Sequence, residues 1–329
     1  MPSKRYFSIA ITIVILIFLG KNIYEHWRGL GAISLSPQSW LLLGVATLVT
    51  LLAHCWAGGI WWQILRFLHQ DLPLQQILPV YLKTNIAKYL PGNIWHYYGR
   101  VWAVTRYGGT KTAATISVLL EPLLMAAAAL TISLLGIPKS FWSLALMGLG
   151  VILVILHPVV LNYLLQILAK FKSSFQTSDK SLANLKSQPL EPEKLDPSTL
   201  PITILSTSRT PRLITKYPVF LFLAEIGFLQ LRFWGFCLVF VAIAPLPILD
   251  LQFLFSAFSL GWVAGLVIPI PAGLGVFEST MLILLQPQIS PTVILSVVGL
   301  FRLVSILAEL VGAGLSLGSD RQFLNTPKK

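Results

Sequence analysis

Apolar residues in this chain gather in long blocks, a pattern typical of helices that cross a lipid bilayer. The longest blocks cover residues 40–65, 113–136, 141–169, 219–244 and 292–317. A helix needs roughly 20 apolar residues to cross the hydrocarbon, and the blocks lack the two-residue alternation of membrane strands. We predict an all-α, polytopic transmembrane helix bundle over residues 1–329. The shorter run Phe7–Leu19 is expected to be a retained first helix and not a signal peptide.

Two other apolar segments are interrupted by proline and glycine. The breaks contain Pro91 and Gly92 in the first segment, and Pro269, Pro271, Gly273 and Gly275 in the second. After the second break, the stretch Val276–Gln286 precedes another proline and rises only about 16 Å as a helix, half of the hydrocarbon. We therefore predict that each segment is a re-entrant hairpin, which enters and leaves the bilayer on one side. The alternative is that residues 74–90 and 251–268 are full spans.

The two halves of the chain follow the same plan at an offset of about 180 residues. Each half contains a span, a half-helix, a Pro/Gly break, a second half-helix and another span. The first repeat covers about residues 40–136 and the second about residues 219–317. Glycine- and proline-interrupted segments at matching positions of two halves are the best sequence indication of a transporter's binding site.

The charges suggest how the chain is oriented. Only 11% of the residues are charged and the formal net charge is +12, which we attribute to cytoplasmic loops and not to nucleic-acid binding. With cytoplasmic N- and C-termini, 19 of the 24 basic residues face the cytoplasm, including those of a solvated, disordered loop at 170–217. The two repeats then become inverted, with one hairpin entering from each face. The expected location is the plasma (inner) membrane.

Ionisable residues within the apolar segments are candidates for function. They are Glu121, Glu225, Arg232, Glu278, Arg302 and Glu309, together with Arg100 beside the first break. A charge at a helix centre costs roughly 2.5–3.5 kcal/mol on insertion scales, so each requires a reason. One reading is structural pairing between helices, for example a Glu121–Arg302 pair. The other is a lipid or anion site, because arginine and half-helix N-termini both bind phosphate.

An aromatic cluster follows the first break and is more typical of an interfacial belt than of a stacking site. It consists of Trp95, His96, Tyr97 and Tyr98. His54 is expected to be a packed helix residue.

Two motifs resemble signatures of the lysylphosphatidylglycerol synthase transmembrane region, a flippase-like family. The first is Lys88-Tyr-Leu-Pro-Gly-Asn-Ile-Trp followed by Gly99-Arg100, and the second is Ile268-Pro-Ile-Pro-Ala-Gly-Leu-Gly-Val-Phe-Glu278. The resemblance implies two re-entrant segments and, in some members, the flipping of aminoacylated phospholipids. Ala272 departs from the family's usual glycine. Because no aminoacyl-transfer domain follows Leu317, lipid aminoacylation is not carried over.

The expected function is therefore translocation of a phospholipid or lipid-linked headgroup, with a phosphate-bearing membrane lipid as partner. The alternative is a non-transporting accessory or regulatory subunit of an envelope lipid or glycan pathway, which would bind a lipid-modifying or glycosyl-transferring enzyme. The sequence has no Ser/His/Asp set, metal-spaced histidines or nucleotide-binding loop. We expect no enzymatic activity, no metal and no cofactor.

Overall fold

The regular structure of the protein is helical throughout the part that the computed structural model describes. That part comprises residues 36–90, 94–163, 166–167, 216–244, 251–268, 273, 275–286 and 288–324. Its four long apolar helices are α2 (Pro37–Phe67), α5 (Lys111–Ser133), α8 (Val219–Ile243) and α11 (Pro291–Leu324). Each is long and apolar enough to cross a membrane. The chain is thus a multi-pass membrane protein, as the apolar blocks predict.

The helix expected over residues 141–169 is interrupted. A 3₁₀ turn, η2 (Lys139–Phe141), leads into α6 (Trp142–Ile155), which ends shortly before His157 and Pro158. Proline has no N–H to donate and clashes with the preceding turn, so it breaks a helix at this point. The predicted helix at Phe7–Leu19, and residues 170–215 of the predicted loop, lie outside the described residues.

Both interrupted segments form pairs of short helices. The first contains α3 (Leu74–Asn85), the 3₁₀ turn η1 (Ile86–Tyr89) and α4 (Trp95–Arg106), and the second contains α9 (Leu251–Val267) and α10 (Val276–Leu285). Within each segment the two helices pack against each other. The predicted break residues Pro91, Gly92, Pro269 and Pro271 lie outside the described residues.

The two ends of the first interrupted segment lie together. The Thr110 N–H, which follows α4, donates a 2.8 Å hydrogen bond to Oε1 of Gln70, which precedes α3. The chain therefore returns after α4 to the place where it entered α3. Short helices that return in this way cover much less depth than the neighbouring long helices.

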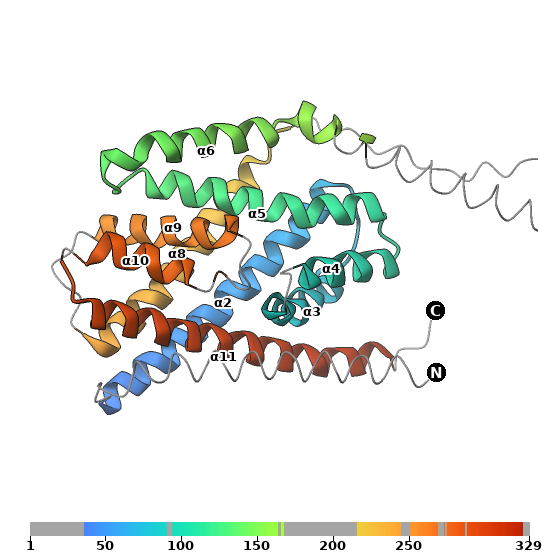
Figure 1. Cartoon of the computed structure of the whole chain (residues 1–329). Helices are drawn as coiled ribbons and strands as arrows, with labels where there is room; N and C mark the ends of the chain where they lie inside the picture. Colours follow the sequence, from blue (N-terminus) through green and yellow to red (C-terminus); the bar gives the residue numbers. More distant parts are fainter. Residues whose placement is uncertain are drawn as a thin grey trace, which may run out of the picture.

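The short helix pairs lie toward opposite ends of the bundle. Figure 1 shows α3 and α4 near the start of α5, and α9 and α10 near its other end, with the long helix α2 running between them. α2 packs along α8, and α5 packs along α9. Ala126–Ala129 of α5 are all buried, and such small side chains let two membrane helices approach closely.

Glycine permits the sharp turn between α9 and α10. Gly273 has φ +61° and Gly275 has φ +83°, both in the left-handed region that disfavours other residues. A Cβ on Gly273 would lie only 3.0 Å from the Cα and carbonyl oxygen of Gly265. The turn therefore brings the backbone before α10 directly against α9.

Candidate functional site

A cavity of about 200 Å³ lies between the two interrupted segments. Its lining comes from η1, α4, α5, α8, α9, α10 and α11, and therefore from both halves of the chain. The lining residues that bear on its chemistry are Lys88, His96, Arg232, Trp262, Phe301 and Arg302. Three of these are cationic, while no acidic side chain is found among the described lining residues.

Arg232 of α8 is buried, yet its guanidinium is only partly hydrogen-bonded. Nη2 donates a 2.9 Å hydrogen bond to Ser305 Oγ, whereas Nε and Nη1 have no hydrogen-bond partner among the described residues. The ring of Trp262 lies 5.0 Å from its Cζ and the ring of Phe301 4.7 Å. Ring faces attract a cation but do not accept all of its N–H groups. Arg232 thus lines the cavity with a guanidinium whose Nε and Nη1 find no hydrogen-bond partner among the described residues.

Lys88 connects the first interrupted segment to the last long helix. Its Nζ donates a 2.5 Å hydrogen bond to Oε1 of Glu309 on α11. Nε2 of His54 lies 3.3 Å from the same oxygen, and Nδ1 of His54 lies 3.4 Å from the Asn85 side-chain amide. The charge of Lys88 is therefore compensated by Glu309. His54 is buried in α2, as expected for a packed helix residue, and these polar groups are its neighbours.

Arg302 of α11 binds the turn between α9 and α10. Its Nη2 donates to Glu278 Oε2 at 2.8 Å and to the Gly273 carbonyl at 2.9 Å, and its Nε donates to Glu278 Oε1. Glu278 also accepts a 2.9 Å hydrogen bond from the Gly275 N–H, so it caps α10 at the same time. This bidentate arrangement compensates the charge of Arg302 and fixes the turn.

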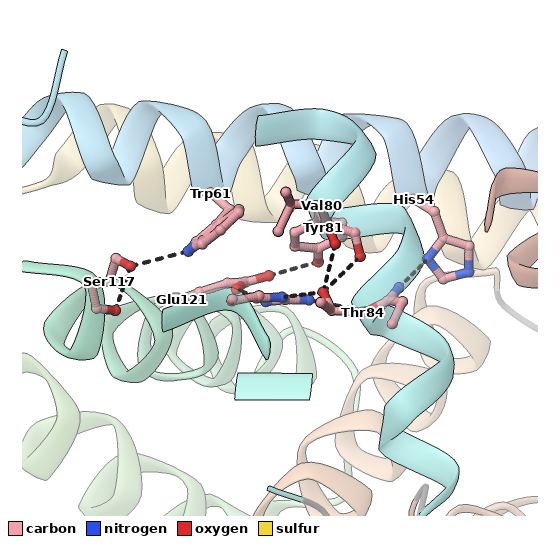
Figure 2. A network of polar contacts seen from close by, with 10 residues as sticks. His54, Trp61, Val80, Tyr81, Thr84, Ser117 and Glu121 are labelled. Carbon is pink, nitrogen blue, oxygen red and sulfur yellow. Dashed lines mark hydrogen bonds and ion pairs between the residues drawn. The ribbon is translucent and has the colours of Figure 1, made fainter. Parts of the chain in front are cut away.

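Arg100 and Glu121 form a separate, closed network. Arg100 donates to Glu121 Oε2 at 2.5 Å, to Asn85 Oδ1 at 3.0 Å and to Thr84 Oγ1 at 3.4 Å. The Tyr81 hydroxyl donates to the other carboxylate oxygen of Glu121 at 2.6 Å. Figure 2 shows this row of polar contacts, from the Trp61–Ser117 hydrogen bond at one end to His54 at the other. Every guanidinium nitrogen of Arg100 is thus engaged by another side chain, as the reading of structural pairing between helices predicts.

The Glu121–Arg302 pair expected as one reading of the sequence is not what the structure contains. Glu121 pairs with Arg100, and Arg302 pairs with Glu278. Each partner lies on the short helix next to the long helix in the chain, α4 beside α5 and α10 beside α11. Pairing within each half needs no reach across the bundle.

Glu225 lies away from the cavity although it shares a helix face with Arg232. It is completely buried and neither carboxylate oxygen has a hydrogen-bond partner among the described residues. The two residues are two turns apart, so about 10 Å of helix separates them. Of the sequence candidates, Arg232 and Arg302 line the cavity, while Glu278 and Glu309 hold its cationic residues in place.

Three lining residues of the cavity, Lys88, His96 and Tyr97, were not predicted as site residues from the sequence. Lys88 is one of the 19 basic residues expected to face the cytoplasm, but it lines the cavity. His96 and Tyr97 were assigned to an aromatic belt, but they also line the cavity, whereas Trp95 and Tyr98 are exposed. His96 is buried and Tyr98 is exposed because residues two apart in a helix lie on opposite faces. This helical periodicity is the sequence signal that could have separated the cavity-lining residues from the exposed ones.

Residues 6–312 match the family described as Lysylphosphatidylglycerol synthase TM region. A comparison with curated proteins finds no significant match. The family match includes both interrupted segments and all four long helices up to residue 312. It agrees with the resemblance of the motifs around the two breaks, at 88–100 and 268–278. The chain belongs to the lysylphosphatidylglycerol synthase transmembrane-region family.

Proposed function

We propose that this protein is a flippase-like translocator of a phospholipid or lipid-linked headgroup across the plasma (inner) membrane. The observation that carries the proposal is the cationic cavity between the two interrupted segments. A buried arginine with unused donors suits a phosphate group, since guanidinium N–H groups match phosphate oxygens. The proposed translocation includes no enzymatic reaction, so the lipid headgroup would cross the membrane chemically unchanged.

The arrangement of the short helices supports a translocation route. We propose that α3–α4 and α9–α10 are re-entrant hairpins that enter from opposite faces of the membrane, as parts of two inverted repeats at about 40–136 and 219–317. The Gln70–Thr110 hydrogen bond at the ends of the first hairpin favours this arrangement. So does the position of the two pairs toward opposite ends of the bundle in Figure 1. A site between two such hairpins is separated from each face by only half of the membrane.

Two ion pairs at matching positions support the proposed repeat, although the acidic and basic residues have exchanged places between the two halves. In the first half the short helix α4 supplies Arg100 and the long helix α5 supplies Glu121. In the second half α10 supplies Glu278 and α11 supplies Arg302. The same connection between short and long helix therefore occurs twice, with opposite polarity.

The orientation of the chain is part of the same proposal. Cytoplasmic N- and C-termini would direct the hairpin α3–α4 to the cytoplasm and α9–α10 to the opposite face. The Lys88–Glu309 ion pair would then join the cytoplasmic hairpin to the last long helix. Because this contact joins the two proposed repeats, a change in access from one face to the other would have to alter it.

Leaflet exchange in reconstituted vesicles tests the proposal. Vesicles that contain the purified protein should move labelled phosphatidylglycerol between leaflets faster than protein-free vesicles. Arg232→Ala should slow exchange by about tenfold or more, because it removes a charge-assisted hydrogen bond. Arg106→Ala is the matched control, since Arg106 lies over the Trp102 ring outside the cavity. Exchange at the protein-free rate, with co-purification of a lipid-modifying or glycosyl-transferring enzyme, would favour the accessory-subunit alternative.

A further inference from the structure

Buried polar atoms without a hydrogen-bond partner occur on cavity-lining residues from both halves of the chain. Arg232 of α8 is 3% exposed and leaves Nε and Nη1 without a partner among the described residues. His96 of α4 is 7% exposed, and its Nδ1 is likewise without a partner within the described part of the chain. A buried polar group without a hydrogen bond costs about 1–3 kcal/mol, and more if it is charged. Both residues line the cavity, so a ligand bound there is the candidate for the missing hydrogen-bond partners.

The charge that such a ligand must neutralise can be counted. Lys88 is paired with Glu309, and Arg302 is paired with both oxygens of Glu278. Arg232 contacts a serine hydroxyl and two rings, which carry no formal charge. The described lining thus holds one uncompensated positive charge. A ligand with one negative charge balances it, whereas a dianion would leave a buried negative charge.

The cavity is poorly suited to an ammonium group. Its described lining contains no carboxylate that could pair with one. Aromatic faces are the alternative partners of ammonium groups, but three of the five Phe, Tyr and Trp rings in the described lining already lie beside a cation. Trp262 and Phe301 flank Arg232, and Tyr89 has the Lys88 ammonium 5.3 Å from its ring centroid. A headgroup amine would therefore meet three cationic side chains and no carboxylate that could form an ion pair with it.

The volume of the cavity fits a headgroup. One water needs about 10–15 Å³ of cavity volume, and this cavity has about 200 Å³. That space suits a phosphate with a small alcohol attached, and the Nδ1 of His96 could hydrogen-bond to the hydroxyl of such an alcohol.

We propose that this cavity selects a phosphodiester headgroup that carries one net negative charge and no amine, with Arg232 as its anchor and His96 as its second polar contact. The inference rests on the proposed function for the identification of the ligand as a lipid. Aminoacylated, choline-type and phosphomonoester headgroups are excluded by the charge balance. An unmodified phosphodiester lipid such as phosphatidylglycerol satisfies it.

Equilibrium binding to the purified full chain tests the selectivity without any transport step. The probes are short-chain phosphatidylglycerol, phosphatidylcholine, phosphatidate and lysyl-phosphatidylglycerol, with glycerophosphoglycerol as the lipid-free phosphodiester. We expect a Kd for phosphatidylglycerol at least about tenfold lower than for the three other lipids, since one unpaired charge is worth that factor or more. Equal affinities for the four lipids, or tighter binding of the lysyl lipid, would overturn the inference.

Variants identify the anchor. Arg232→Gln should reduce the preference for phosphatidylglycerol to about twofold or less, and His96→Phe should weaken its binding while the preference for a monoanion persists. Arg106→Gln should retain the wild-type selectivity. Selectivity that survives in Arg232→Gln would contradict the assignment of the anchor. If glycerophosphoglycerol binds as tightly as the lipid, the phosphodiester preference stands and the proposed lipid translocation fails.

Discussion

Two buried arginines differ in how completely their nitrogen atoms are satisfied. Arg100 uses Nε, Nη1 and Nη2 in hydrogen bonds to side chains, and the Tyr81 ring lies 3.9 Å from its Cζ. Arg232 is equally buried but leaves two nitrogens without a partner among the described residues. A satisfied buried ion stabilises the fold only slightly, and an unsatisfied one destabilises it. The contrast favours a structural role for Arg100 and agrees with the ligand-binding role proposed for Arg232.

Replacement of Arg232 by methionine should therefore stabilise the protein while it impairs function. Methionine keeps apolar contact with Trp262 and Phe301 and removes an incompletely paired buried charge. We expect an unchanged or higher free energy of unfolding, by up to about 3 kcal/mol, together with slow leaflet exchange. Thermal unfolding in detergent without anionic lipid measures the first effect. A marked loss of stability in Arg232→Met would indicate a structural role.

The Arg100–Glu121 pair should behave in the opposite way. Arg100→Gln or Glu121→Gln alone leaves one buried charge without its ionic partner, which costs about 3–5 kcal/mol. The double variant should lose less than the sum of the two single variants, with a coupling of about 0.5–3 kcal/mol. A double-mutant cycle on thermal unfolding measures this difference. Additive losses would mean that the 2.5 Å contact contributes no pairwise energy.

At the scale of the elements, the turn before α10 depends on two glycines with different constraints. Gly273 combines positive φ with a backbone contact, because an added Cβ would meet Gly265 at 3.0 Å. Gly275 also has positive φ, but an added Cβ would have no atom within 4 Å. Conformational strain therefore applies to both positions, and steric overlap applies to Gly273 alone.

Substitution by alanine should separate these two effects. Gly275→Ala should cost about 1–3 kcal/mol from left-handed strain alone, and Gly275→Asn should cost less because asparagine tolerates this conformation. Gly273→Ala should be the most destabilising, and it should also slow leaflet exchange because Gly273 lines the cavity. Unfolding temperatures of the three variants test the order. Equal losses for the two alanine variants would contradict the close approach to Gly265.

The elements also differ in how well the sequence predicts them. The long helices follow from apolar length, since no other structure satisfies the backbone in hydrocarbon. The interruptions follow from proline and glycine at the breaks, although α6 ends earlier than its apolar block because of Pro158. The partners of the buried charges do not follow from the sequence. Glu121 could reach Arg100 or Arg302 in principle, and only the packing of α4 on α5 decides between them.

At the scale of the whole molecule, the cavity exists because elements from both halves meet. Lys88 and His96 come from the first half, and Arg232 and Arg302 come from the second. The sequence identified the two arginines by their cost in an apolar segment. It could not identify Lys88 or His96, because a lysine or histidine beside a break is equally typical of a membrane surface. Their participation depends on the return of the first interrupted segment into the bundle.

The proposed function requires that the two interrupted segments are hairpins that open on opposite faces of the membrane, with the cationic cavity between them. Labelling of single cysteines with a membrane-impermeant maleimide tests it most directly, in a chain that lacks Cys55 and Cys237. The pairs to compare are Gln70→Cys with Thr110→Cys, and Ile248→Cys with Ile289→Cys. We predict that the first pair reacts only from the cytoplasmic face and the second pair only from the opposite face. Reaction of the two members of either pair from different faces would contradict the claim.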